Sequence, residues 1–451
     1  MKQQKHMKKI RLIAGLCLLT GIAAGTVLFM KKDNVKIDSD GYIGRSSISV
    51  TDGRMTPEAL LSLGRLSDPQ VSPDGKHILY GVSYTSIEEN RSVRNLFICN
   101  IDGTGNQQLT TSGKSISNAR WYNDGSGIYF LMGGQMWSAH IDEKDGRWEL
   151  TDLYKMTEIP GGITEFKMSP DQHSIMYSSY VKSSVKGPSD CYKDLDKATA
   201  YTTDDLMYRH WDHTVMEIPH TFVVMRQFKS GPITEGTDIL AGEDGLYELP
   251  TEPFGGLEQL SWSPDSRFIA YSCRKLVGKR YAFSTNTEIY IYNVYTAETE
   301  MIEMGGGYDT DPVWSPDGSK LCWISMERDG YEADKQRLIV AEVTIPETID
   351  EMPEISKIQD ITVDFKYNVS SPVWTSDSKG IYFSALAEGI QGIFKAYEES
   401  ESWEIVRITG EDLWYDFGSP FHVSENDGTL TLYTTWCSMD FPTELVAVRC
   451  S

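Results

Sequence analysis

Hydrophobic and polar residues alternate in short runs along most of the chain, a pattern typical of β-strands. Phe268–Tyr271, Glu288–Tyr292 and Lys320–Ile324 are such runs, and they are rich in aromatic and β-branched residues. One segment, Thr56–Leu61, instead predicts a short helix, because Thr is a preferred N-cap and Pro57 suits the first helical position. The pattern therefore predicts an all-β protein.

A turn motif recurs between these strands, in which Ser-Pro-Asp-Gly or a variant follows Trp, Val or Met. Pro presets the second position of a type I turn and Gly suits the fourth. We expect the preceding Trp or Val to face inward and pack on a neighbouring unit. The Asp residues of the motif are Asp74, Asp124, Asp171, Asp265, Asp317, Asp377 and Asp427. Most intervals are near 50 residues; the interval of 94 is twice 47, which predicts a copy near residue 218 that has lost its motif.

A strand–turn–strand unit followed by two further strands, repeated about every 50 residues, is typical of propeller blades. Residues 56–451 are therefore predicted to form a seven- or eight-bladed β-propeller of four-stranded blades. The last unit has strands at Thr429–Tyr433 and Glu444–Val448 but no visible fourth strand. Either an N-terminal segment, for which Ser47–Val50 is a candidate, pairs there, or the chain ends before its ancestor did. An unpaired edge would favour aggregation.

Residues 1–32 differ from the rest of the chain. Basic residues precede an apolar run, Leu12–Met30, and two lysines follow it. This arrangement predicts a secretory signal peptide, with an uncleaved N-terminal anchor as the alternative. Both alternatives predict export to the periplasm, with residues 12–30 as the segment that could anchor the protein in the inner membrane. Residues 33–55 are polar and are interpreted as a linker.

Charge and cysteine content narrow the function. The 42 Lys and Arg residues against 65 Asp and Glu residues give a net charge of −23, which argues against nucleic acid as a partner. Cys99, Cys273 and Cys322 lie in strand-like runs and are predicted to be buried thiols. A disulfide stays open as an alternative in an oxidising compartment.

No motif in the sequence predicts catalysis. GxSxG, HExxH, the Walker A motif and a complete GxGxxG are all absent, so no catalytic, metal or cofactor site is assigned. His210, His213 and His220 with Asp212 could bind a metal, but their spacing matches no standard site. The alternatives are a hydrogen-bonded blade insert or a surface that faces a partner or substrate. The candidate residues for that surface are Arg209, His210, Trp211 and Asp212.

Several segments resemble one family. Thr56–Gly75 is similar to the start of the propeller of exported prolyl oligopeptidase-family serine peptidases, in the dipeptidyl peptidase V and acylaminoacyl peptidase branch. Asp205–Asp212, His220–Val223 and Met439–Leu445 are similar to later segments of that propeller. The resemblance covers about residues 55–449.

The resemblance implies a propeller that restricts access to an α/β-hydrolase domain carrying a Ser, Asp and His triad. No triad residue can be transferred, because the sequence ends where the hydrolase would begin. We therefore expect the chain to be the substrate-gating propeller of a peptidase that acts on short peptides. We expect the propeller to be inactive alone, and its partner to be a hydrolase domain that is missing or separately encoded. The alternatives are a standalone TolB-type propeller that binds protein or peptide partners and, third, a metal-dependent enzyme at the histidine cluster. We also expect the isolated chain to self-associate through the face that the hydrolase would cover.

Overall fold

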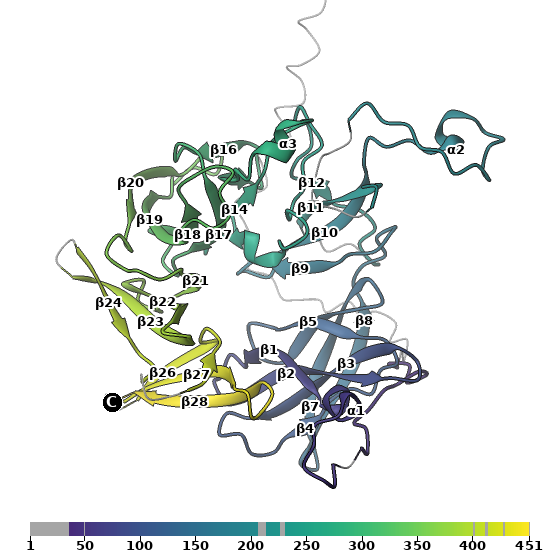
Figure 1. Ribbon diagram of the computed structural model, residues 1–451, viewed down its shortest axis with the longest axis vertical. Coiled ribbons are helices and arrows are strands. Elements are labelled where there is room, and N and C mark those ends of the chain that lie inside the picture. The colour runs from purple at the N-terminus through teal and green to yellow at the C-terminus, as the bar shows by residue number, and fades with distance from the viewer. Residues whose placement is uncertain are drawn as a thin grey trace, which may run out of the picture. The chain divides into compact units, whose positions relative to one another are not determined.

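Seven antiparallel sheets form a seven-bladed β-propeller in the computed structural model (Figure 1). The structure describes residues 36–48, 50–205, 213–225, 231–399, 402–410, 414–426 and 429–450. The predicted signal or anchor segment lies outside these residues. Within the described ranges, no helix is both long and apolar enough to cross a bilayer.

Each blade is one contiguous stretch of chain, and its first strand lies nearest the propeller axis. Blade 1 contains β1 (Arg65–Val71), β2 (His77–Ser86), β3 (Arg91–Asn100) and β4 (Gln107–Gln108). Blade 2 contains β5 (Ile116–Trp121), β6 (Gly127–Met132), β7 (Gln135–Lys144) and β8 (Arg147–Lys155). Blade 3 contains β9 (Glu165–Met168), β10 (Ser174–Lys182), β11 (Glu217–Met225) and β12 (Thr237–Asp238). Blade 4 contains β13 (Leu260–Trp262), β14 (Phe268–Cys273), β15 (Glu288–Asn293) and β16 (Thr299–Ile302). Blade 5 contains β17 (Tyr308–Trp314), β18 (Lys320–Met326), β19 (Arg337–Thr344) and β20 (Glu354–Asp360). Blade 6 contains β21 (Ser370–Trp374), β22 (Gly380–Ala387), β23 (Ile390–Glu399) and β24 (Ser402–Arg407). Blade 7 contains β25 (Asp416–Phe417), β26 (His422–Asn426), β27 (Thr429–Cys437) and β28 (Glu444–Cys450).

Within the described part of the chain, helical structure is confined to short segments outside the sheets. These are α1 (Pro57–Ser62), α2 (Pro188–Cys191), α3 (Arg280–Phe283) and the 3₁₀ helix η1 (Leu257–Gln259). α1 confirms the predicted helix: Thr56 is its N-cap, and the Thr56 Oγ1 accepts a hydrogen bond from the Ala59 N–H at 3.2 Å.

The long interval between repeats has a different cause from the one predicted. Ile218 lies in β11, the third strand of blade 3, which pairs along its length with β10. The prediction of a lost motif copy near residue 218 is therefore wrong. Blade 3 is instead long in sequence, because residues 183–216 are inserted between β10 and β11 and residues 239–259 connect it to blade 4. The propeller consequently has seven blades and not eight.

The recurring turn has the predicted geometry. In blade 1, the Gly75 N–H donates to the Ser72 carbonyl at 2.8 Å, and the Ser72 hydroxyl donates to Asp74 Oδ1 at 2.6 Å. Turns of adjacent blades also contact one another. The Asp317 N–H of blade 5 donates to the Ser378 hydroxyl of blade 6 at 3.2 Å, and blades 3 and 4 make the same contact. The turns thus join neighbouring blades at one face of the propeller.

The Trp residue ahead of the turn fixes the spacing between blades, as predicted. Trp374 Nε1 in blade 6 donates to the Val313 carbonyl in the inner strand of blade 5 at 3.0 Å. Trp121 Nε1 in blade 2 makes the corresponding bond to the Gln70 carbonyl of blade 1 at 3.3 Å. These two indoles pack in the seams between blades and use their only donor on the backbone of the preceding blade, whereas Trp262 and Trp314 are buried in their seams without this bond.

Alternate residues of the middle strands face opposite seams. In β14, Ile269 and Tyr271 pack with residues of blade 3, whereas Phe268 and Ala270 pack with residues of blade 5. This period of two is what a strand buried on both sides requires. Seven apolar clusters fill the seven seams in this way.

The cysteines follow the predicted pattern. Cys99, Cys273 and Cys322 are buried in the seams, and burial raises the pKa of the Cys99 thiol to about 11. The six cysteines of the described chain, Cys191, Cys437 and Cys450 being the others, are all free thiols.

Blade 7 lacks an outer fourth strand among the described residues. β25 and β26 pair with opposite ends of β27, so together they form its inner strand, and β28 pairs with the other side of β27. The described residues of Ser47–Val50 form no strand, and therefore the predicted pairing of this segment with the last blade is not observed. The segment before it packs on blade 1, where the Gly113 N–H donates to the Asp38 carbonyl at 3.0 Å.

We expect acid to weaken the turn-to-turn contacts through Asp317. Burial alone would raise the pKa of Asp317, but hydrogen bonds from the Ser319 N–H and from the hydroxyls of Ser315, Ser319 and Ser378 outweigh it and lower this pKa to about 2. Because the pKa is lower in the folded state, the contribution to stability is complete above pH 4 and is lost as the pH falls toward 2. Replacing Asp317 by Asn should cost about 1 kcal/mol or less at pH 7 and should reduce the loss of stability between pH 4 and pH 2.

Urea unfolding at several pH values measures this effect. Asp350→Asn, in an exposed connection of the same blade, is the matched control. Identical pH dependence of the Asp317→Asn protein and the unmodified protein would contradict the assignment.

Candidate functional site

Four inner strands carry a β-bulge at the same position. Asp68 in β1, Asn118 in β5, Asp311 in β17 and Ser371 in β21 have φ values of 51°, 52°, 56° and 50°, and the strand pairing shifts register there. A bulge re-aims the side chain, and short polar residues tolerate the left-handed backbone better than others. The repetition places short polar side chains along the inner surface of the propeller.

A sequence signal for these bulges exists, although the repeat analysis missed it. Each bulged residue stands three positions before the Trp or Val of the turn motif, follows Ser or Thr, and precedes Pro or Ala. The preference for Asp, Asn or Ser at that position is the trace that a left-handed bulge leaves in the sequence.

Two arginines share the first of these carboxylates. Arg120 Nη1 of blade 2 contacts both oxygens of Asp68 at 2.8 and 2.9 Å. Arg94 of blade 1 donates to the Ser67 hydroxyl at 3.0 Å and lies 3.8 Å from Asp68. Burial lowers the pKa of Arg94, while Asp68 opposes this effect. One carboxylate between two guanidinium groups leaves this part of the inner surface net positive.

Lys167 connects blade 3 to blade 4. Its Nζ donates to the carbonyls of Leu257 and Leu260, at 2.6 and 2.5 Å. Burial, followed by the charge of Arg120, lowers the pKa of Lys167 to about 8. The ammonium group therefore spans a blade seam at the inner surface, where its charge state changes close to neutral pH.

Carboxylates gather next to this lysine. Burial and the neighbouring charge of Glu258 raise the pKa of Glu165 to about 7. The two carboxylates converge on Gly256, where an added Cβ would lie 3.0 Å from Glu258 Oε2 and 3.5 Å from Glu165 Oε2. Burial also raises the pKa of Asp311 in blade 5. The acidic groups Glu165, Glu258 and Asp311 thus lie in or between blades 3 to 5, and the basic groups Arg94, Arg120 and Lys167 lie in blades 1 to 3.

A buried His–Asp pair lies in the middle and outer strands of blade 3. His220 Nδ1 of β11 is 2.7 Å from Asp238 Oδ2 of β12, and His220 is 5 % exposed. Such a pair can orient an imidazole for catalysis, but at this depth no substrate can reach it. We interpret His220 as structural.

One face of the propeller carries the most exposed apolar side chains. This is the face formed by the connections between second and third strands and between successive blades. Of the large hydrophobic side chains in the described residues, eight are more than 60 % exposed, and all eight belong to this face. They are Met55, Tyr192, Phe254, Phe283, Val363, Leu386, Trp414 and Met439.

The predicted partner-facing residues Arg209, His210, Trp211 and Asp212 lie outside the described residues. They belong to the insert of blade 3, which connects β10 to β11 and therefore starts and ends at the same face. Asp205, which precedes them, accepts a hydrogen bond from the Gly278 N–H of blade 4 at 3.1 Å. The metal site predicted from His210, His213, His220 and Asp212 includes two of these residues, His210 and Asp212, and it therefore stays a prediction. Among the residues that the structure does describe, no three His, Cys, Asp or Glu side chains form a metal-binding group.

The inner surface offers both signs of charge, and the apolar face offers area for another domain to cover.

Comparisons with known proteins identify relatives. The chain is 41 % identical over 390 residues to dipeptidyl-peptidase 5 of Porphyromonas gingivalis, a match that covers 85 % of this chain and 53 % of that protein. It is also 41 % identical over 289 residues to dipeptidyl-peptidase 5 of Porphyromonas endodontalis, covering 63 % of this chain and 40 % of that protein. The chain therefore spans about half the length of the curated relatives it matches. No family model matches it.

A solved structure supports the fold. Acylaminoacyl peptidase from Pyrococcus horikoshii superimposes with a TM-score of 0.54 at 15 % identity, over 86 % of this chain and 52 % of that one. This likeness shows a shared propeller architecture. With the sequence relationship to the two bacterial proteins, it identifies the chain as a β-propeller of the prolyl oligopeptidase family, homologous to dipeptidyl-peptidase 5.

Proposed function

We propose that this propeller is the substrate-gating domain of an exported serine peptidase of the dipeptidyl or acylaminoacyl type, which acts on short peptides. The catalytic α/β-hydrolase domain would be supplied from outside these 451 residues. The observation that carries the proposal is the confinement of all eight highly exposed apolar side chains to one face.

Exposed apolar side chains on one face favour a covering domain. Burial of a Phe, Leu, Met or Val side chain stabilises a contact by about 1.5–3 kcal/mol. Apolar side chains that gather on one face, in the connections of several blades, favour this face as an interaction site. The match covers 53 % of one Porphyromonas relative and 40 % of the other, so each relative has further sequence about as long as the match or longer, which supports a second domain.

The charged inner surface supports a selective role. An extended short peptide carries a charged group at each end, and Glu165, Glu258, Arg94 and Arg120 present partners of both signs. Access along this surface would favour flexible peptides over folded proteins, which cannot unfold to enter without a large cost in free energy.

The chain alone is expected to be inactive. The sequence lacks a GxSxG nucleophile motif, and a binding surface without nucleophile, base and oxyanion hole accelerates hydrolysis little. The N-terminal basic and apolar segment supports export to the periplasm, with a cleaved signal peptide and an uncleaved inner-membrane anchor as the proposed alternatives.

A chimera tests the gating role. The full chain would be joined to the catalytic half of the Porphyromonas gingivalis relative and compared with that half alone. We expect the chimera to cleave chromogenic dipeptide substrates but to cleave casein at least tenfold more slowly than the catalytic half does. Equal rates of casein cleavage by the chimera and by the catalytic half would overturn the gating proposal. A chimera that binds the dipeptide substrates but does not cleave them would favour a standalone binding propeller.

Substitutions on the apolar face test the docking role. Phe254→Ser, Trp414→Ser and Met439→Ser should each weaken association with a separately supplied catalytic half by about tenfold, because each removes more than 1.4 kcal/mol of apolar burial. They should also reduce self-association in sedimentation. Tyr295→Ser and Ile349→Ser, at the opposite face, are matched controls. Equal losses in both sets would show that the apolar face is not the docking surface.

A further inference from the structure

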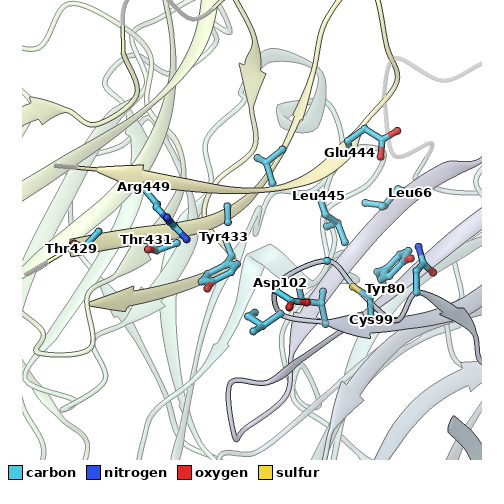
Figure 2. Close-up of a pocket in the computed structure, with 16 residues that line it drawn as sticks. Leu66, Tyr80, Cys99, Asp102, Thr429, Thr431, Tyr433, Glu444, Leu445 and Arg449 are labelled. Atoms are coloured by element: carbon cyan, nitrogen blue, oxygen red, sulfur yellow. The ribbon is translucent and has the colours of Figure 1, made fainter. Parts of the chain in front are cut away.

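The seam between blades 7 and 1 is packed differently from the other six. Its apolar cluster takes its buried members, among them Ile78 and Tyr80, from blade 1 alone, while blade 7 adds only Phe421 and Leu445. The same seam contains a cavity of about 800 Å³ (Figure 2). This volume lies within the range of about 300–1,000 Å³ that is typical of small-molecule sites.

Both walls of this cavity carry polar and apolar groups. Blade 1 contributes aliphatic and aromatic side chains together with Asp102 and Asn106, and blade 7 contributes hydroxyl groups and apolar side chains together with Glu444 and Arg449. The residues of blade 1 are Leu66, Ile78, Tyr80, Cys99, Ile101, Asp102, Gly103 and Asn106; those of blade 7 are Thr429, Thr431, Tyr433, Glu444, Leu445, Val446, Ala447 and Arg449.

Strand register brings a cation and two hydroxyl groups of blade 7 together. Thr431 of β27 pairs with Arg449 of β28, and Tyr433 pairs with Ala447, so these four residues share one face of blade 7. Figure 2 shows Arg449, Thr431 and Tyr433 grouped at one end of the cavity, away from Tyr80 and Cys99. One end of the cavity therefore combines a positive charge with hydroxyl groups.

Arg449 brings a positive charge to this cavity. Among the residues that the structure describes, it makes no ion pair. Asp102 accepts hydrogen bonds from the Thr104 N–H and hydroxyl at 2.9 and 2.6 Å, so its own turn engages it. Glu444 is five positions away along β28, about 16 Å in an extended strand. An anionic ligand group could therefore pair with Arg449 without displacing an internal partner.

We propose that this cavity binds an amphipathic carboxylate. The carboxylate would pair with Arg449, with Thr431 and Tyr433 as hydroxyl donors, and the apolar body would lie against Leu66, Ile78 and Leu445. Two sources share this chemistry: the free C-terminus of a short apolar peptide and a fatty acid. A ligand here would fill the poorly packed seam and join the two ends of the propeller. The inference does not depend on the proposed peptidase function.

Calorimetry on the full chain tests the site with four probes: octanoate, octanamide, the peptide acetyl-Ala-Ala-Leu-Leu and its C-terminal amide. We expect octanoate or the free-acid peptide, or both, to bind at least tenfold more tightly than the matching amide. Octanoate binding alone would identify the fatty-acid source, and peptide binding alone the C-terminus. No binding of either carboxylate at millimolar concentration, or equal binding of acid and amide, would overturn the proposal.

Two variants locate the binding. Arg449→Gln should weaken carboxylate binding at least tenfold, because charge-assisted hydrogen bonds are lost. The charge-matched control is Arg147→Gln, on the outer hairpin of blade 2, which should leave carboxylate binding unchanged. Thr431→Phe should block binding while preserving the melting temperature, because it fills an existing void. Equal effects of the two arginine variants, or normal binding by a folded Thr431→Phe protein, would place the ligand elsewhere.

Discussion

Burial of the middle strands on both sides is the constraint on which the rest of this structure depends. A single four-stranded sheet has two apolar faces, and each can be covered only by the next sheet. Phe268 and Ile269 show the result, because neighbouring residues of one strand belong to two different interblade clusters. Everything at the inner surface is held in place by these seams, including the Asp68–Arg120 contact that joins blade 1 to blade 2.

The sequence reveals the fold well because the fold is repetitive. Each turn has a local sequence motif. Trp374 in one blade and Trp121 in another, for example, both donate a hydrogen bond to the inner strand of the preceding blade. The repeat analysis failed where an insertion broke the period, since spacing alone does not distinguish a long connection in blade 3 from an extra blade. Pairing of β10 with β11 settles that question and depends on contacts between residues far apart in sequence.

The site was less accessible to sequence reasoning. The convergence of Glu165 and Glu258 depends on the seam between blades 3 and 4, and no local pattern joins residues so far apart. The apolar face was expected in general terms, but its members were not, because a Phe in a connection has the same sequence signature whether it is buried or exposed. Phe254 and Leu249 lie in the same connection, yet one is exposed and the other is fully buried. The bulged Asp and Asn residues, by contrast, could have been found from their fixed offset to the turn.

Every blade is built from one continuous stretch of chain, and blade 7 takes no strand from the N-terminal region among the described residues. Most contacts within a blade are therefore between residues close in sequence, which favours rapid formation of each sheet. The blades can assemble in order as the chain emerges, each one templating the next, without waiting for the last residues. Only the meeting of blade 7 with blade 1 requires all seven blades. Ring closure can therefore follow the folding of the single blades, and it takes place at a seam whose buried apolar cluster comes from blade 1 alone.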